Sequence, residues 1–406
     1  MSLYQSLTLP NGAVLPNRIA KAAMEENLAD AGHLPGEQLL GLYRQWAAGG
    51  VGMMLTGNVM IDHMAMTGPG GVALEAETPL EPFKAWAKAG KAHGAAMWMQ
   101  INHPGRQVWS AMNGKALAPS AVQVDLGKQS SMMAQPRAMT ENEIQDVIQR
   151  FVITSTRAVE AGFDGVQIHA AHGYLLAQFL SPISNKRDDQ WGGSLENRAR
   201  LLYEVVKAVR EALPSLAALS VKINSADFQR GGFEPADAEV VVLELAELGV
   251  DLIELSGGSY ESPAMQGRTA DGRTLAREAY FLEFAEAIAK TCSVPLMTTG
   301  GIRRKPVVEQ VLKAGVSVVG IGTALSYQPD LPNQWRSDDT AAVTLPEIRW
   351  KNKNIAAMAQ MAIVKQQFIR MGKGKQPSAK PSPLFSLLKD QAKQAKLRKI
   401  YRQTYS

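Results

Sequence analysis

Short apolar runs alternate with longer amphipathic segments along most of this chain, and this alternation restricts the folds open to it. The apolar runs predict strands at residues 18–24, 52–56, 96–101, 165–168, 220–223, 252–255, 296–299 and 318–321. The segments between them predict helices near residues 37–48, 80–94, 141–161, 195–213, 235–248, 280–291 and 305–313. Several runs lack apolar–polar alternation, as expected for strands covered on both faces. Such a repeat is typical of an α/β protein with a parallel sheet.

Eight strand–helix units fit a (β/α)8 TIM barrel, and a doubly wound open sheet is the competing architecture. We favour the barrel because polar residues and glycines follow nearly all eight apolar runs, and barrels build their active sites at the carboxyl ends of their strands. Residues 110–139 form a long connection that contains Pro119 and Pro136, so we expect a cap over the barrel mouth. The predicted barrel spans residues 1–335.

Residues 336–406 differ from the barrel in composition. From Glu347 to Ser406 there are fourteen Lys or Arg and two acidic residues, whereas the first 346 residues carry 29 basic and 36 acidic side chains. We predict a basic helical C-terminal extension, with helices near 352–371 and 384–402 and a linker at about 372–383. A packed or solvated extension is the preferred interpretation of the last helix. Contact with a partner subunit, a membrane surface or nucleic acid is the alternative. Because the excess positive charge belongs to the tail, it says nothing about the ligand of the barrel, and we expect no nucleic-acid partner.

The single cysteine, Cys292, excludes a disulfide framework and any Cys-only metal or iron–sulfur site within one chain. Neither a signal peptide nor an apolar run near the ~18 residues of a membrane span is recognisable. We therefore expect a cytoplasmic protein without a membrane span.

The most informative stretch is His169-Ala170-Ala171-His172-Gly173-Tyr174, which follows a predicted strand. Two imidazoles and a phenol gather there, and both groups can donate hydrogen bonds and move protons near neutral pH. His169 and His172 could instead ligate a metal, but zinc catalysis requires three protein ligands and no third ligand is evident. We expect catalytic roles for His169, His172 and Tyr174, and no metal.

Other polar residues and glycines end neighbouring strands. Lys222 lies inside an apolar strand, and either a Schiff-base lysine or a cation placed against an electron-rich ligand would explain it. Gln100 ends the third strand. His103 is more simply explained as structural. Arg106 could either form a salt bridge or reach toward the site. The remaining signal is two glycine pairs that predict a phosphate site after the last two strands, at Gly300-Gly301 and at Gly320 with Gly322.

Three stretches carry a resemblance to a known family: Leu15 to Ile19 (LPNRI), Gln100 to Gln107 (QINHPGRQ), and His169 to Arg198 (HAAHGYLLAQFLSPISNKRDDQWGGSLENR). In these stretches the chain resembles the old yellow enzyme family of FMN-dependent ene-reductases, over roughly residues 1–330. The resemblance implies that NADH or NADPH reduces FMN and that flavin N5 passes a hydride to an activated alkene. It also implies that the His pair holds the substrate oxygen and that Tyr174 protonates the α-carbon.

The same resemblance implies a set of FMN-binding residues: Ala23, Met24, Gly57, Gln100, His169, Lys222, Gly300, Gly301, Gly322 and Thr323. Gln100 would bind the flavin ring, and Lys222 would lie beside its N1 and O2 atoms. Ala23, Glu25 and Thr323 depart from the family pattern, in which Pro, Thr or Cys, and a phosphate-binding Arg are common. Family members are often dimers or tetramers, so a homo-oligomer is among the expectations.

We therefore expect an enzyme that reduces electron-poor C=C bonds of unsaturated carbonyl or nitro compounds with NAD(P)H. Three alternatives remain. The same scaffold could perform other flavin chemistry, such as oxidative demethylation. A cofactor-free lyase could use Lys222 as a Schiff base. The barrel could also be a binding or scaffold protein that acts through its basic tail.

Overall fold

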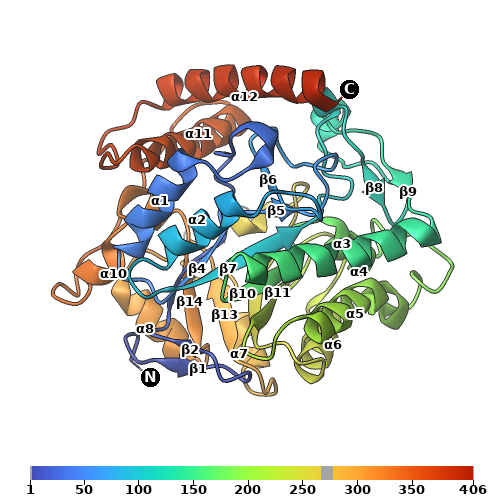
Figure 1. Cartoon of the computed structure of the whole chain (residues 1–406), viewed down its shortest axis with the longest axis horizontal. Helices are drawn as coiled ribbons and strands as arrows, with labels where there is room; N and C mark the ends of the chain where they lie inside the picture. The colour runs from blue at the N-terminus through green and yellow to red at the C-terminus, as the bar shows by residue number, and fades with distance from the viewer. Residues whose placement is uncertain (1, 267–277, 406) are drawn as a thin grey trace.

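The computed structural model describes residues 2–266 and 278–405, and a closed parallel barrel lies at its centre (Figure 1). The eight barrel strands are β3 (Ile19–Lys21), β4 (Met53–Leu55), β7 (Ala96–Asn102), β10 (Gly165–Ala170), β11 (Ala218–Asn224), β12 (Leu252–Ser256), β13 (Leu296–Thr299) and β14 (Val318–Ile321). Each pairs in parallel with its neighbours, and β14 pairs with β3, which closes the ring. The predicted (β/α)8 barrel is confirmed, and the open doubly wound sheet is wrong.

Helices follow the strands and form the outer layer. They are α1 (Glu37–Ala47), α2 (Glu81–Gly90), α3 (Glu141–Glu160), α5 (Leu195–Ala212), α6 (Pro235–Glu247), α7 (Leu282–Ile288) and α8 (Lys305–Lys313). Local sequence defines their ends. The Thr140 hydroxyl accepts from the Glu143 N–H, and the Glu143 carboxylate accepts from the Thr140 N–H, which makes a capping box at the start of α3.

The lower half of the barrel interior is apolar. Inward-facing side chains of alternate strand positions fill it, namely Ala20, Met53, Leu55, Trp98, Ala218, Leu252, Met297 and Val318. Leu9 and Leu15 of the antiparallel pair β1 (Leu7–Thr8) and β2 (Val14–Leu15) join this cluster. Since side chains alternate along a strand, the next inward positions lie two residues further along, toward the carboxyl ends. Those positions include Gln100, Ser220, Glu254 and Thr299, so the upper half of the interior is polar.

Extra segments are built onto the carboxyl end of the barrel. The short strand β5 (Val59–Met60) pairs with the last two residues of β7, and β6 (Val72–Ala73) pairs with β5. The connection after β7 contains η2 (Ser110–Met112), β8 (Leu117–Ala118), η3 (Gly127–Met132) and β9 (Arg137–Ala138), with β8 paired to β9. This connection is the segment predicted as a cap.

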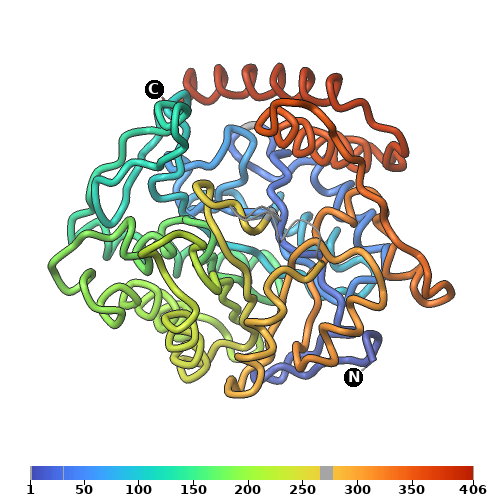
Figure 2. The backbone as a smooth tube through the Cα atoms, turned by 180° about the vertical axis from the view of Figure 1, so that it is seen from behind, coloured from blue at the N-terminus to red at the C-terminus, as the bar shows by residue number. Residues whose placement is uncertain are grey.

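Two long helices follow the barrel. After the short helices α9 (Ala324–Tyr327) and α10 (Leu331–Gln334), α11 (Lys353–Gly372) packs against α1, and α12 (Pro383–Tyr405) returns along α11 (Figures 1 and 2). The far end of α12 contacts η2 of the cap, and the Tyr401 hydroxyl donates to the carbonyl of His63, between β5 and β6, over 2.7 Å. The predicted basic helix therefore packs on its own barrel, while the proposed division at residues 335 and 336 stays a prediction. Within residues 2–266 and 278–405, no helix combines the length and apolar character that crossing a bilayer requires.

Candidate active site

His169, His172 and Tyr174 form one cluster at the carboxyl end of β10. The centroid of the His169 ring lies 5.0 Å from that of His172 and 4.9 Å from that of Tyr174. His172 has a left-handed φ of +59°, which is uncommon outside glycine, and its backbone N–H donates to Asn224 Oδ1 over 3.0 Å. Tyr174 immediately precedes the short helix α4 (Leu175–Leu180). The sharp turn between β10 and α4 therefore brings the three side chains together, as the sequence predicted.

Hydrogen bonds define the state of the two imidazoles. His169 Nδ1 accepts the Ala171 N–H over 3.2 Å, so a neutral His169 carries its proton on Nε2. His172 Nε2 lies 2.8 Å from Ser256 Oγ of β12. Burial, and then the charge of Lys222, holds the pKa of both imidazoles well below 6.5. Both rings are therefore neutral at pH 7, and they can offer hydrogen bonds without carrying a charge.

The Tyr174 phenol is also held in its neutral form. Burial raises its pKa well above 10, and the neighbouring Tyr260 and Glu25 reinforce that shift. The Tyr174 hydroxyl lies 3.2 Å from the Tyr260 hydroxyl and accepts from Asn58 Nδ2 over 3.4 Å. Tyr174 can therefore act as a proton donor across the neutral pH range.

A buried polar network lies beside the His pair inside the barrel, where Lys222 is the register partner of His169. Lys222 Nζ donates to Glu254 Oε1 over 2.8 Å, and Thr299 Oγ1 donates to the same oxygen over 2.7 Å. Gln167 Nε2 donates to Glu254 Oε2 over 2.9 Å, while Gln167 Oε1 accepts from Gln100 Nε2 over 2.7 Å. Gln100 and Lys222, which the sequence marked as separate residues, thus belong to one hydrogen-bonded chain.

The other predicted cofactor residues lie at the same end of the barrel. Ala23 and Met24 follow β3, and Gly57 follows β4. A Cβ atom on Gly57 would lie 2.2 Å from the Met24 carbonyl oxygen, and one on Gly322 would lie 3.8 Å from Met24 Sδ. The ends of β3, β4 and β14 therefore converge around Met24, and Gly57 permits the close approach.

The predicted phosphate site has a compact backbone. Gly301 has φ +66°, and a Cβ atom there would lie 2.5 Å from the Tyr280 hydroxyl. The helix α8 begins four residues later at Lys305, while Thr323 directly precedes α9. A glycine turn that leads into a helix N-terminus suits a phosphate. Together with the Gln100 amide and the Lys222 ammonium for the ring, this donor set fits FMN.

His103 and Arg106 have structural roles. His103 Nδ1 accepts the Gly105 N–H over 3.0 Å, and burial lowers the pKa of His103 to about 4. Arg106 pairs with Glu261 over 2.7 Å and donates to the carbonyls of residues 122 and 123. Of the two interpretations of Arg106, the salt bridge is correct, and this ion pair ties the cap to the loop after β12.

Sequence reasoning missed several residues of the site. Glu254 interrupts the apolar strand Leu252-Ile253-Glu254-Leu255, which is the same signal that singled out Lys222. Tyr260 lies in a loop and had no sequence signal beyond its residue type. The Glu25 carboxylate accepts a hydrogen bond from the Thr67 hydroxyl, so the loop between β5 and β6 holds this departure from the family pattern in place.

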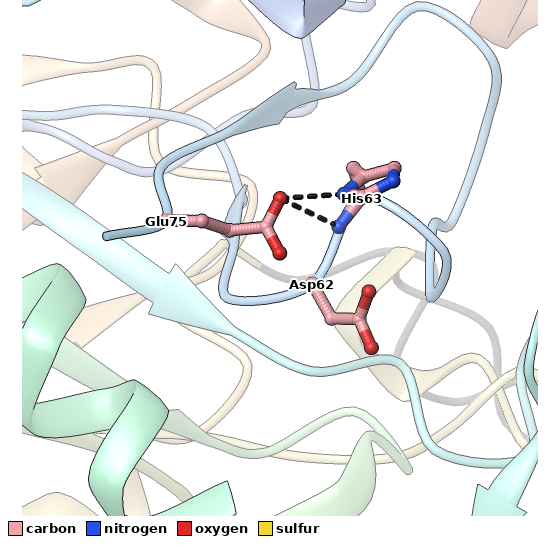
Figure 3. Close-up of side chains that lie close together, drawn as sticks. All are labelled: Asp62, His63 and Glu75. Carbon is pink, nitrogen blue, oxygen red and sulfur yellow. Dashed lines mark hydrogen bonds and ion pairs between the residues drawn. The ribbon is translucent and has the colours of Figure 1, made fainter. Parts of the chain in front are cut away.

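One cluster of metal-ligating side chains lies outside the barrel interior, at Asp62, His63 and Glu75 (Figure 3). His63 Nδ1 lies 2.6 Å from Glu75 Oε2, and Arg150 also pairs with Glu75 over 3.2 Å. Lys115 pairs with Asp62 over 3.1 Å. Because each carboxylate already has a cationic partner, we interpret this group as an ion-pair cluster.

Comparisons with known proteins agree with this geometry. The profile of the NADH:flavin oxidoreductase / NADH oxidase family matches residues 2–339. The "NADH-dependent flavin oxidoreductase iliE" of Hypocrea jecorina is 36% identical over 375 residues, which cover 84% of this chain and 92% of that protein. The "NADPH dehydrogenase" of Clostridium acetobutylicum is 30% identical over 331 residues, which cover 81% of this chain and 93% of that protein.

Solved structures show the same fold. The old yellow enzyme homologue from Zymomonas mobilis superposes with a TM-score of 0.71 at 24% identity, and the match covers 84% of this chain and 95% of that one. The chain therefore belongs to the NADH:flavin oxidoreductase / NADH oxidase family, the old yellow enzymes, and is an FMN-dependent oxidoreductase that uses NADH or NADPH.

Proposed function

We propose that this enzyme reduces electron-poor C=C bonds conjugated to a carbonyl or nitro group. FMN held in the barrel and reduced by NADH or NADPH would supply the hydride that adds to the β-carbon. The observation that carries the proposal is the cluster of two neutral imidazoles, the buried His169 and the partly buried His172, beside the buried neutral phenol of Tyr174. The same residues that bind and polarise the substrate can therefore also complete the reaction with a proton.

The His pair would hold the substrate oxygen. Negative charge grows on that oxygen as the β-carbon accepts the hydride, and a fixed hydrogen-bond donor stabilises it most in a buried site. His169 is suited to this role because its Nδ1 is occupied by the Ala171 N–H, which leaves Nε2 as the donor. His172 is fixed by Asn224 at its backbone and by Ser256 at its ring.

Tyr174 would deliver the proton to the α-carbon. Its hydroxyl is protonated at neutral pH, and its ring packs edge-on against His169. The hydroxyl of Tyr260 is within hydrogen-bond distance and can orient the phenol. Gln100 and Lys222 would bind the pyrimidine edge of the flavin ring, with the glycines after β13 and β14 at its phosphate.

A Schiff-base lyase is the weaker interpretation of Lys222. Schiff-base formation requires a free amine, whereas the Lys222 amine nitrogen is held 2.8 Å from the buried carboxylate of Glu254. A cytoplasmic location remains part of the proposal, in keeping with a single cysteine.

The test is an anaerobic half-reaction of the FMN-loaded protein. The enzyme is reduced with one equivalent of NADH or NADPH and mixed with cyclic enones or nitroalkenes, the oxidised enzyme is mixed separately with N-methylated amines, and flavin absorbance is followed in both. The proposal predicts rapid reoxidation by enones or nitroalkenes with a saturated product. Reoxidation by none of these alkenes, or turnover restricted to oxidation of N-methyl substrates, would refute it.

A further inference from the structure

The carboxylate of Glu254 has no assigned role, although it is among the most deeply buried charged groups of the barrel. It is fully enclosed, and three donors converge on its two oxygens: the Lys222 ammonium, the Thr299 hydroxyl and the Gln167 amide. Lys222 and Glu254 face each other as register partners on β11 and β12. The pair is thus built into the strand pairing.

A buried ion pair of this kind is poorly explained by stability. Desolvation of two charges offsets most of their attraction, and well-packed apolar residues of similar volume are often as stable or more so. The surrounding layer of the barrel shows that apolar packing is available, because Leu252 and Met297 fill the positions two residues below Glu254 and Thr299. A function at the upper, polar end of the barrel is the better explanation.

We propose that Glu254 is a positioning residue that sets both the charge and the hydrogen-bond direction of the flavin-ring site. This inference rests on the proposed placement of the ring at Gln100 and Lys222. Glu254 holds Lys222 in one orientation and opposes its positive charge. Lys222 therefore donates a hydrogen bond to the ring without acting as an isolated cation.

The second effect passes through the two glutamines. Since Glu254 can only accept hydrogen bonds when ionised, it fixes the Gln167 amide with its Nε2 toward Glu254 and its Oε1 toward Gln100. Gln100 must then direct its Nε2 to Gln167, which leaves Gln100 Oε1 and one N–H for the ring. Glu254 thereby determines that the Gln100 amide presents its Oε1 and one N–H to the flavin ring.

The charge effect has a definite sign. A lone cation beside the pyrimidine edge stabilises the reduced, more negative flavin, whereas the paired carboxylate opposes that stabilisation. Glu254 therefore lowers the reduction potential of bound FMN and makes the reduced flavin a stronger hydride donor. Acceptors that are only weakly activated become accessible to such an enzyme.

The experiment is a redox titration of the FMN-loaded Glu254→Gln protein against wild type. Glutamine keeps the shape and removes the charge. We expect the equilibrium constant for flavin reduction to rise about tenfold, which is about 30 mV for a two-electron couple. Glu261→Gln is the matched control, because it neutralises a buried paired carboxylate in the loop after β12, and its potential should equal that of wild type.

A double-mutant cycle separates the charge effect from a general disturbance. If the charge of Glu254 opposes flavin reduction, then Glu254→Gln should raise the equilibrium constant for reduction at least tenfold also when Lys222 is already Met, because the carboxylate is then unpaired. A wild-type potential in Glu254→Gln with FMN retained, or no rise in the Lys222→Met background, overturns the proposal.

If Glu254→Gln does not retain FMN, the single variant Lys222→Met decides instead. It leaves Glu254 without its cationic partner, so the potential must fall by more than tenfold in equilibrium constant, and an unchanged or raised potential overturns the proposal. These titrations do not depend on alkene reduction. A protein that binds FMN but reduces no alkene would refute the proposed function while still testing Glu254.

Discussion

The hydroxyl oxygens of Tyr174 and Tyr260 lie 3.2 Å apart, although the two residues come from the carboxyl ends of different barrel strands. Burial raises the pKa of both phenols above 10. Two neutral phenols in hydrogen-bond contact can share one proton-donating role, with the residue nearer His169 as the donor. The rim of the barrel therefore holds a proton source that does not titrate at neutral pH.

Tyr174→Phe should lower turnover by about 10²- to 10⁴-fold, the usual contribution of a general acid. Tyr260→Phe should lower it by less than tenfold, because it removes only an orienting partner. Steady-state rates from pH 7 to pH 10 provide the measurement, and wild type should show no loss through ionisation of Tyr174 in this range. An equal loss in the two variants would contradict the assignment of Tyr174 as the donor and Tyr260 as an orienting partner only.

The buried His103 should make the fold less stable in acid. Its pKa is about 4 in the folded protein against about 6.5 for an unperturbed imidazole, so the unfolded chain binds the proton first as the pH falls. The contribution of His103 to the free energy of unfolding is therefore fully present above pH 6.5. It decreases by about 3 kcal/mol as the pH falls from 6.5 to 4. Urea unfolding at several pH values checks it. His103→Gln should make the free energy of unfolding depend less steeply on pH between 4 and 6.5, whereas the same change at the exposed His93 should leave this dependence unaltered.

The ion pair between Arg106 and Glu261 should determine how firmly the cap is held. Both side chains are buried, and removal of one partner from such a pair typically destabilises by about 3–5 kcal/mol. Glu261→Ala should therefore speed amide hydrogen exchange in residues 122–133 before the barrel itself opens. Glu347→Ala, in an exposed pair with Arg349, is the control that should change nothing. Unaltered exchange in Glu261→Ala would show that other contacts hold the cap.

The end of α12 should contribute measurably to stability. Tyr401 is buried among Met60, Met66 and Met112, and its hydroxyl bonds the His63 carbonyl. Tyr401→Ala should therefore lower the free energy of unfolding by about 3–5 kcal/mol, as for other large aromatic side chains. Ile400 lies next to it and is 46% exposed, so Ile400→Ala should cost less than about 0.5 kcal/mol. Equal effects in thermal or urea unfolding would mean that α12 is not docked in solution.

Sequence reasoning captured the features that depend on local pattern. The eight apolar runs and the helices between them correspond to the barrel because each element is defined by its own residues and caps, as at Thr140. The clustering of His169, His172 and Tyr174 followed from their position directly after one strand. All of these signals lie within a few residues of one another in the chain.

The features that sequence reasoning missed depend on contacts between distant segments. Lys222 was recognised as a charge in an apolar strand, but its partner Glu254 lies 32 positions away and only the register of β11 and β12 joins them. The docking of Tyr401 on His63 spans 338 positions. Nothing in the local pattern of α12 indicates that it packs on the loops after β3 and β5.

The most direct test of the proposed chemistry is a single-turnover measurement on His172→Ala. The FMN-loaded variant is reduced and mixed with an enone, and the rate of flavin reoxidation and the FMN content are compared with those of wild type. We predict a loss of about 10²- to 10³-fold in the rate, the scale of one oxyanion-stabilising donor, with FMN content retained. A rate within a few-fold of wild type would contradict the role assigned to the His pair.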